Sequence, residues 1–189
     1  MDKSYSGIAT YEYPDGRFYS GEFVNGMPQG KGHMTFPNQD IYEGEWSEGK
    51  MHGRGEYRRF NIEKDKYVEW YIGEFVAGVM QGNGRIQFEN RIVYEGQWQN
   101  GKRTGVGTLW SSPSEYIHGL WKFNEIIRGV QHFENGDWYE GTFKNSKFHG
   151  FGRYFYSSGA LFDGEFENGK PTKGVSITPD GIITTIGES

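Results

Sequence analysis

One short pattern recurs along almost the whole chain: an aromatic residue, a variable residue, a glycine, a second variable residue and a second aromatic residue. Its copies are YSGEF at 19–23, YEGEW at 42–46, YIGEF at 71–75, YEGQW at 94–98, YEGTF at 139–143 and FDGEF at 162–166, with a degenerate copy, IHGLW, at 117–121. The central glycines are 22 or 23 residues apart, except for one interval of 29. A steady period of this length indicates a repeat architecture, in which each unit is one supersecondary element.

Each copy is followed by a turn and then by the second half of the unit. The turns read VNGM, SEGK, VAGV, QNGK, KNSK and ENGK, and a pair of glycines usually comes next. Asn-Gly and related dipeptides between alternating strands are the strongest short-range signal for a hairpin. We therefore predict one β-hairpin per unit. The fold class is all-β: an elongated, single-layer antiparallel β-meander of about seven stacked hairpins.

The two flanks differ from the body of the array. Residues 1–18 contain GIATYEYPDG, which matches the second half of a unit and predicts an N-terminal half-repeat cap. The array is predicted to span 19–174, with extra residues inserted at 58–71. Residues 175–189 are rich in aliphatic and β-branched residues, and they predict a C-terminal capping hairpin or tail.

The glycines are predicted to complement the aromatic residues. A two-residue turn at 48–49 would place Tyr42 opposite Gly55, Gly44 opposite Gly53, and Glu43 opposite Arg54. Side chains alternate between the two faces of a strand, so the aromatic residues and the glycines share one face. An aromatic ring lying over a glycine fills the empty space and covers the neighbouring backbone. The same arithmetic applies to the other regular units.

The opposite face is predicted to be charged and solvated. Its acidic residues are Glu22, Glu43, Glu45, Glu74, Glu95, Glu140, Asp163 and Glu165. These acids follow one another in a ladder along the strands, and they do not converge from a loop. A calcium site is therefore disfavoured.

Composition excludes several classes of function. There is no cysteine, so disulfides and thiolate chemistry are excluded. The net charge is −5, which disfavours broad nucleic-acid binding and a purely electrostatic grip on anionic lipid. No apolar run approaches the ~18 residues of a membrane span, and the N-terminus does not read as a signal peptide. We expect a soluble cytoplasmic protein.

No catalytic or metal-binding constellation can be assembled. The histidines are His33, His52, His118, His132 and His149, and no two of them have the spacing of a metal motif such as HExxH. The repeated GxG triplets lie within predicted strands, whereas a phosphate cradle needs a loop that leads into a helix. The sequence predicts no enzyme activity, no metal site and no cofactor.

The pattern YxGxW…GKxHGxG at a period of 23 residues resembles the MORN repeat (membrane occupation and recognition nexus). Residues 42–55 and 94–107 match it closely, and 19–32 and 139–152 match it with small changes. The resemblance spans roughly residues 5–174. Arrays of this kind occur in junctophilins, in plant phosphatidylinositol phosphate kinases, in axonemal radial-spoke proteins and in apicomplexan and trypanosomatid cytoskeletal proteins.

The resemblance implies a twisted rod with a groove lined by the aromatic and glycine positions. It also implies partners that are mainly proteins, as helical or extended segments in that groove, while phospholipid binding is proposed for the family as well. The candidate groove residues are Tyr19, Phe23, Tyr42, Trp46, Tyr71, Phe75, Tyr94, Trp98, Trp121, Tyr139, Phe143, Phe162 and Phe166.

The insertion at 58–71 is the first departure from the pattern. It is predicted to extend a hairpin beyond the sheet edge. Its basic residues, Arg58, Arg59, Lys64 and Lys66, are set among acids. The segment is either a tolerated surface loop or a secondary partner contact.

The fifth unit and the C-terminus also depart from it. Ile126 and Ile127 lie near the expected turn and first glycine of unit five, where they either repack a bend or join an apolar patch with Trp110, Trp121 and Phe123. At the C-terminus, Ile182 and Ile183 belong to a last hairpin. That hairpin either caps the array or mediates homo-association or strand addition through a bare edge.

Two hypotheses of different classes follow. The first is a non-catalytic scaffold or adaptor that binds a partner protein segment in the aromatic groove, within a cytoskeletal or ciliary (axonemal) assembly by family analogy. The alternative is a peripheral membrane module that binds phosphoinositides through the basic residues of 58–71. Net charge weighs against the alternative.

Overall fold

The computed structural model describes residues 2–187. Residue 1 of the predicted N-terminal cap and residues 188–189 of the predicted C-terminal tail lie outside the described residues. The described chain contains sixteen strands, β1 to β16, which follow one another in the sheet in chain order, and no helix. It divides into two compact units, one ending at Gly101 and the other beginning at Lys102. Within 2–187, no helix could cross a membrane.

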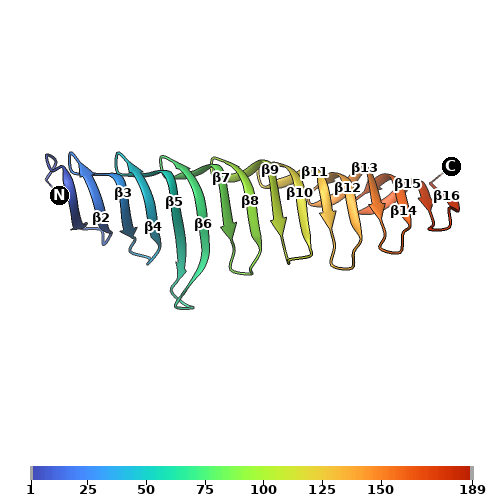
Figure 1. The fold of residues 1–189 in the computed structure, drawn as a ribbon, viewed down its shortest axis with the longest axis horizontal. Helices are drawn as coiled ribbons and strands as arrows, with labels where there is room; N and C mark the ends of the chain where they lie inside the picture. The colour runs from blue at the N-terminus through green and yellow to red at the C-terminus, as the bar shows by residue number, and fades with distance from the viewer. Residues whose placement is uncertain (1, 188–189) are drawn as a thin grey trace. The chain divides into compact units, whose positions relative to one another are not determined.

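The unit that ends at Gly101 contains eight strands (Figure 1). They are β1 (Gly7–Glu12), β2 (Phe18–Val24), β3 (Met27–Thr35), β4 (Ile41–Ser47), β5 (Lys50–Asn61), β6 (Lys66–Val76), β7 (Val79–Gln87) and β8 (Val93–Gln99). Each strand pairs antiparallel with the next.

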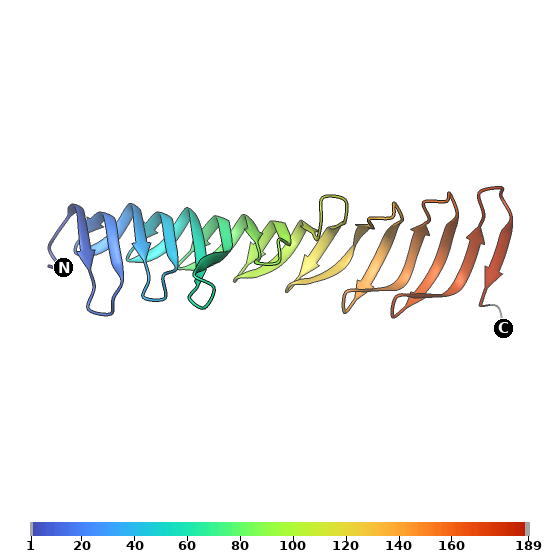
Figure 2. The ribbon, with the colours of Figure 1, turned by 90° about the horizontal axis from the view of Figure 1, so that it is seen from below.

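The unit that begins at Lys102 contains the other eight. They are β9 (Lys102–Trp110), β10 (Tyr116–Lys122), β11 (Glu125–His132), β12 (Trp138–Lys144), β13 (Lys147–Phe155), β14 (Leu161–Glu167), β15 (Lys170–Ile177) and β16 (Ile183–Ile186). Here too each strand pairs antiparallel with the next, and Figure 2 shows the turns alternating between two sides of the ribbon. The all-β meander of hairpins is confirmed. The predicted boundaries 1–18, 19–174 and 175–189 stay a prediction.

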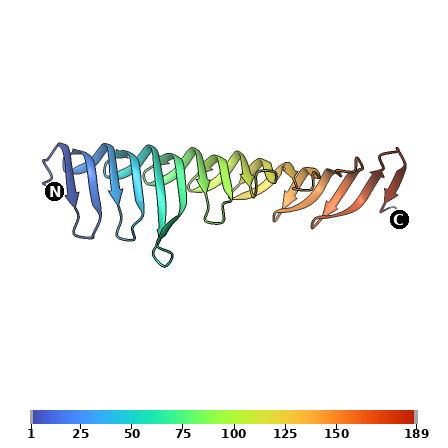
Figure 3. The same cartoon turned by 60° about the horizontal axis from the view of Figure 1, so that its bottom comes forward.

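Two kinds of turn alternate along each unit and lie on opposite edges (Figures 1 and 3). The tight turns have two central residues with positive φ, such as Asn25 at 49° and Gly26 at 71°. This is the type I′ geometry, which matches the twist of the flanking strands. In the turn at 48–49 the second central residue also donates its N–H to the preceding hairpin, from Gly49 to the Pro28 carbonyl at 2.9 Å.

The predicted register is wrong beyond the first two or three pairs after each tight turn. Trp46 faces Met51 as predicted, but Tyr42 faces Tyr57 and Gly44 faces Gly55. The reason is a β-bulge that inserts two extra residues into the second strand of the hairpin. It moves the first glycine of the pair to the other face. The predicted cross-strand pair of Glu43 with Arg54 is wrong for the same reason.

The bulge explains why glycines come in pairs. The first glycine of each pair has a φ between 58° and 73°, a region that other residues avoid. These glycines are Gly30, Gly53, Gly82, Gly105 and Gly150. The hairpins β10–β11 and β14–β15 have only one extra residue in the bulge and lack that glycine. The missing residue also accounts for the 22-residue interval after Gly119.

The second glycine of each pair belongs to a column of glycines, one on each strand from β2 to β15, that follow one another across the sheet. In the first unit the column is Gly21, Gly32, Gly44, Gly55, Gly73, Gly84 and Gly96, and it ends at Ala9 on the edge strand. In the second unit it is Gly107, Gly119, Gly129, Gly141, Gly152, Gly164 and Gly174, and it ends at Ile186. We call this set the glycine column.

The backbones approach too closely at the glycine column for any side chain. A Cβ added to Gly44 would lie 2.5 Å from the Gly55 Cα and 2.6 Å from the Tyr42 hydroxyl. The same atoms constrain Gly21, whose added Cβ would lie 2.5 Å from the Gly32 Cα. The predicted ring-over-glycine contact is therefore present, with the ring of Tyr42 lying against Gly55.

The insertion extends one hairpin, as predicted. β5 and β6 are the longest strands, with 12 and 11 residues, and their loop reaches beyond the neighbouring loops in Figure 1. Phe60 and Tyr67 pack edge to face across the extension, with ring centroids 5.2 Å apart. Its role in binding a partner stays a prediction.

Replacement of a column glycine tests this packing. We expect Gly44→Ala to destabilise the protein by about 2–4 kcal/mol, because the new methyl group has backbone and a buried hydroxyl within its radius. The matched control is Glu43→Ala on the exposed face of the same strand, which should change stability by about 0.5 kcal/mol or less. Unfolding midpoints in urea compare the two. Equal effects would refute the close approach.

Candidate functional site: a trough over the glycine column

The thirteen predicted groove residues form the core. Each of them has an exposed fraction of 6 % or less, and Tyr19, Tyr42, Tyr94 and Tyr139 are fully buried. Their rings pack edge to face along each unit, as in Tyr42 with Trp46 and with Phe75, where both centroid distances are 5.1 Å. These side chains therefore fill the groove that they were predicted to line. Contact between them and a partner stays a prediction.

The tyrosine hydroxyls bind the backbone beneath them. Tyr42 donates to the Glu45 carbonyl at 2.9 Å, and Tyr19, Tyr71 and Tyr139 donate to the carbonyl three residues on at 2.9–3.1 Å. Burial raises the pKa of Tyr19 and of Tyr139 to about 12, so these phenols stay protonated donors at neutral pH.

The tryptophans link neighbouring hairpins. Trp46 donates its indole N–H to the Gly32 carbonyl at 3.1 Å, and Trp98 donates to the Gly84 carbonyl at 3.1 Å. In the degenerate unit Trp121 makes the same bond to Gly107 at 3.0 Å. Each acceptor is a column glycine on the strand before.

The face opposite the aromatic residues carries an open hollow in the first unit. Gly32 and Gly44 line it at the column, and the hollow measures about 530 Å³. The side chains around it come from the two rows that flank the glycine column. They are Ser20, His33 and Glu43 on one side and Lys31, Glu45 and Arg54 on the other.

A second hollow of about 440 Å³ lies at the same place in the other unit. Gly141 and Gly152 line it at the column. Its side chains are Arg128, Glu140, Thr142, Phe151, Arg153 and Asp163. Each unit thus has one hollow, and we call this hollow, with its lining residues, the glycine trough of that unit. The sequence predicted a solvated charged face here and missed the hollows.

The glutamate after the column glycine completes the bulge. The carboxylate of Glu45 accepts the Arg54 N–H at 3.2 Å, and that of Glu74 accepts the Asn83 N–H at 2.9 Å. Glu22 does the same for Lys31 at 3.0 Å. These acids satisfy an amide near each bulge while lying on the trough side. The alternation of the sequence predicted them only as solvated residues.

Two buried aspartates link the looser turns to the strands beyond them. Asp137 accepts hydrogen bonds from the Ser157 N–H at 2.8 Å, the Tyr154 hydroxyl at 2.8 Å and the Asn135 side chain at 2.9 Å. These donors, with the Ser157 N–H first, hold the pKa of Asp137 below its usual range. Asp40 makes the same set of contacts with Asn38, Tyr57 and the Phe60 N–H.

The basic residues of the insertion are largely paired with acids. Arg59 binds Glu69 at 2.7 Å, and Arg58 and Lys64 form ion pairs with Glu56 and Glu89. The positive charge that suggested a lipid contact is therefore mostly neutralised, by acids of the hairpin itself and by Glu89 in the β7–β8 turn.

The remaining secondary candidates divide by burial. Ile126 is buried beside Trp121, whereas Ile127 is exposed as the extra residue of its bulge. Ile182 and Ile183 are exposed at the last hairpin, next to β16 or within it. Within residues 2–187, no three His, Asp or Glu side chains are arranged to hold a metal ion.

This geometry is that of a repeat protein made of β-hairpins. The hairpins stack through an aromatic ladder on one face and through a column of glycines. The profile of the MORN repeat matches residues 19–41, 42–61, 71–91, 94–113, 139–161 and 162–172. These matches cover more than half of the chain, so the chain belongs to the MORN repeat family. The predicted family is confirmed.

Several curated proteins are similar to part of the chain. Alsin of Rattus norvegicus and Alsin of Homo sapiens are 30 % identical over 129 residues, which are 60 % of this chain and 8 % of theirs. The ALS2 C-terminal-like protein of Bos taurus is 29 % identical over 107 residues, 57 % of this chain and 9 % of its own. The chain spans less than a tenth of the length of these relatives.

Two solved structures show a more distant likeness. The SAS-4 TCP domain of Drosophila melanogaster, in complex with a proline-rich motif of Ana2, is 16 % identical with a TM-score of 0.37, over 95 % of this chain and 83 % of that one. The TCP10 domain of Danio rerio CPAP, in complex with a STIL peptide, is 14 % identical with a TM-score of 0.35, over 97 % and 96 %.

Removal of one buried hydroxyl tests the tyrosine bonds. We expect Tyr42→Phe to cost about 1–2 kcal/mol, because the Glu45 carbonyl loses its donor in a buried place. Tyr67→Phe is the control, since the Tyr67 ring is exposed and its hydroxyl makes no hydrogen bond within residues 2–187. Urea unfolding midpoints report both, and equal losses would argue against a structural role for the Tyr42 hydroxyl.

Acid titration tests the buried aspartate. The pKa of Asp137 is lower in the folded chain than in the unfolded chain, so its stabilising effect is present above the unfolded pKa and is lost as pH falls through the folded pKa. We expect Asp137→Asn to lower the thermal midpoint at pH 7, with a difference from the wild type that shrinks below about pH 4. Glu134→Gln, at an exposed turn, is the control. A difference that is independent of pH would contradict the assignment.

Proposed function

We propose that the chain is a non-catalytic scaffold that binds a segment of a partner protein in the glycine trough. The observation that supports this most is an open hollow with glycine at its centre in each unit. The side-chain positions of the column point to the aromatic face, so on this face bare strand backbone forms the floor of the hollow, where a partner segment can lie. Repeat arrays use extended surfaces of this kind for binding.

The side chains around the trough favour a polypeptide partner. In the first unit Lys31 and Arg54 stand near Glu43 and Glu45, and no ion pair joins these four within residues 2–187. Charges of both signs suit a polar peptide segment, whereas a nucleic acid or a phosphorylated ligand calls for cations alone. Both a helical and an extended segment are compatible with this surface.

The thirteen groove aromatics enter the proposal as support. Their rings hold the glycine column from the opposite face and so keep the trough open. The family resemblance implies that these aromatic side chains contact a partner directly. Their exposed fractions of 6 % or less leave little aromatic surface for such a contact. That contact stays a prediction.

The setting is proposed by family analogy alone. Cytoskeletal and axonemal proteins are among the members of the family, so we propose a cytoskeletal or ciliary assembly in the cytoplasm. The phosphoinositide alternative has less support, because the net charge is −5 and three of the four basic residues in the insertion are paired.

Homo-association through the terminal strands is a further part of the proposal. β1 and β16 are the first and last strands of the sheet order. All four residues of β16 are exposed. Edge strands offer unpaired backbone groups to another chain. Concentration-dependent sedimentation compares the wild type with Ile183→Lys, which should remain monomeric if the edge mediates association.

Site-specific crosslinking tests the trough. A photo-reactive phenylalanine analogue at Glu43, in the trough, should capture one protein in cells, while the same analogue at Glu134, in an exposed turn, should not. The double variant Lys31→Glu, Arg54→Glu should lose the capture by about tenfold or more through charge repulsion.

The control carries the same charge change away from the trough. Lys144→Glu with Lys147→Glu alters two exposed residues beside the β12–β13 turn and should leave the capture intact. Two results would overturn the proposal. One is equal crosslinking of the partner from positions 43 and 134, and the other is an equal loss of crosslinking in the two double variants.

A further inference from the structure

The turn between β10 and β11 holds an unusual residue. Phe123 and Asn124 are its two central residues, with φ values of 51° and 75°. The first central position of the other type I′ turns is held by Asn25, Glu48, Ala77, Asn100, Asn145 and Asn168. A large side chain with positive φ is an outlier, and such strain gathers at functional sites.

Neighbouring residues hold this turn in place. The Asn124 N–H donates to the Arg103 carbonyl at 3.0 Å, and the Arg103 N–H donates to the Asn124 side-chain oxygen at 2.8 Å. The Arg103 guanidinium also donates to the Asn124 carbonyl at 2.9 Å and lies over the Trp121 ring. The turn is thus fixed to the hairpin before it, and Phe123 is presented from a rigid base.

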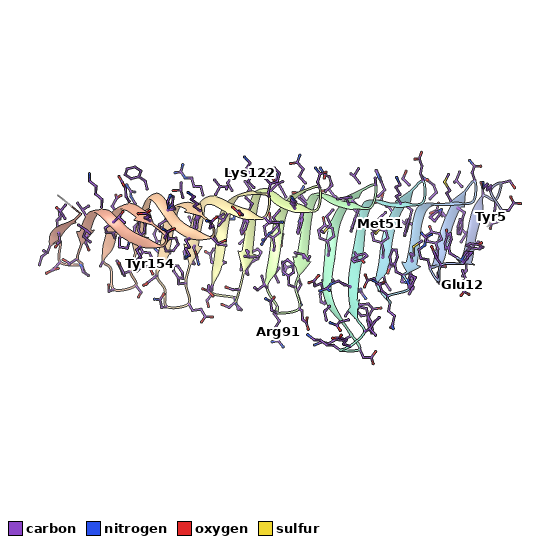
Figure 4. The ribbon with its side chains drawn as sticks, turned by 180° about the vertical axis from the view of Figure 1, so that it is seen from behind. Tyr5, Glu12, Met51, Arg91, Lys122 and Tyr154 are labelled. Carbon is purple, nitrogen blue, oxygen red and sulfur yellow. The ribbon has the colours of Figure 1, made fainter. Side chains whose placement is uncertain are left out.

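The Phe123 ring is exposed, and two cations lie close to it. Its exposed fraction is 61 %. The Lys102 ammonium lies 5.6 Å and the Lys122 ammonium 5.8 Å from the ring centroid. Figure 4 shows Lys122 pointing outward at the edge of the tight turns. An exposed aromatic ring flanked by cations has the composition of an interface anchor.

Two more apolar side chains belong to the same strand ends. Leu120 is 51 % exposed and faces Arg128 across the β10–β11 pair. Ile127, the extra residue of the bulge beside it, is 37 % exposed. A glycine occupies the bulge in the regular units, so the degenerate unit replaces it with an exposed aliphatic side chain.

The charge of this region is opposite to that of the chain. Residues 102–132 contain four Lys or Arg and two Glu, a net charge of +2, whereas the whole chain has −5. Within residues 2–187, no carboxylate forms an ion pair with Lys102, Lys122 or Arg128. These cations are available to a partner.

We propose that Leu120, Phe123 and Ile127, with Lys102, Lys122 and Arg128, form a docking surface for an acidic protein segment that carries a large apolar side chain. The apolar side chain packs on the Phe123 ring, and carboxylates on either side of it meet the two ammonium groups. The charge complementarity selects this occupant. The surface shares only Arg128 with the residues that line the trough.

Selection from a displayed random-peptide library on the full chain tests this surface. Peptides that depend on Phe123 are obtained by counter-selection on Phe123→Asn. This variant restores the residue type of the other turns, so its unfolding midpoint should equal or exceed that of the wild type. The selected peptides should carry a net negative charge and at least one large apolar residue. Their affinity for Phe123→Asn should fall by about tenfold or more.

Three further measurements complete the test. Lys102→Gln with Lys122→Gln should weaken the selected peptides and reduce the salt dependence of binding, while Tyr156→Asn, at an exposed turn of the same unit, should leave binding unchanged. Vesicles with anionic lipid should not bind. Selected peptides that are neutral or basic, equal affinity for Phe123→Asn, or Phe123-dependent binding to vesicles alone would overturn the proposal. None of these outcomes depends on Lys31 or Arg54, so partner binding in the trough is tested independently of this surface.

Discussion

The close approach of neighbouring backbones at the glycine column is the constraint on which the rest of the structure depends. Gly44 and Gly55 face each other with no room for a Cβ, and the Tyr42 ring lies over the space that side chains would have filled. Because the ring is buried there, a sheet of one layer obtains an aromatic core without a second sheet. The tyrosine hydroxyl then binds the backbone below it, so ring, glycine and carbonyl form one unit of packing.

The polar features follow from that packing. The bulge that brings Gly44 opposite Gly55 needs a residue with positive φ, which is Gly53. The bulge leaves the Arg54 N–H without a partner in the opposite strand, and this N–H donates a hydrogen bond to the Glu45 carboxylate. A residue that the sequence places on the charged surface therefore completes the strand pair. On this outer face the strand backbone at the column forms the floor of a hollow between two rows of charged and polar side chains. The surface proposed for binding is thus the reverse side of the core.

The period of the sequence predicted the hairpins, the tight turns and the sharing of a face by Tyr42 and Trp46. It did not predict the register, because counting residues from the turn assumes a regular ladder. The signal was present: a second glycine two residues before the column glycine, and a separation of 11 residues from Gly44 to Gly55 against 10 from Gly119 to Gly129. The Asp137 contacts could also be found, since Asp40 and Asp137 share an Asn two residues before and a Tyr 17 residues after. The trough could not, because its shape depends on the bulge.

The separate roles of the two glycines in a pair can be measured directly. Chemical ligation allows D-alanine to replace either Gly53 or Gly55, and D-residues prefer positive φ. We expect D-alanine to be tolerated at 53, where φ is 59°, and to lower the urea unfolding midpoint at 55, which lies in the column with no positive φ. Equal effects at the two positions, or a larger loss at 53, would contradict separate roles for the two glycines.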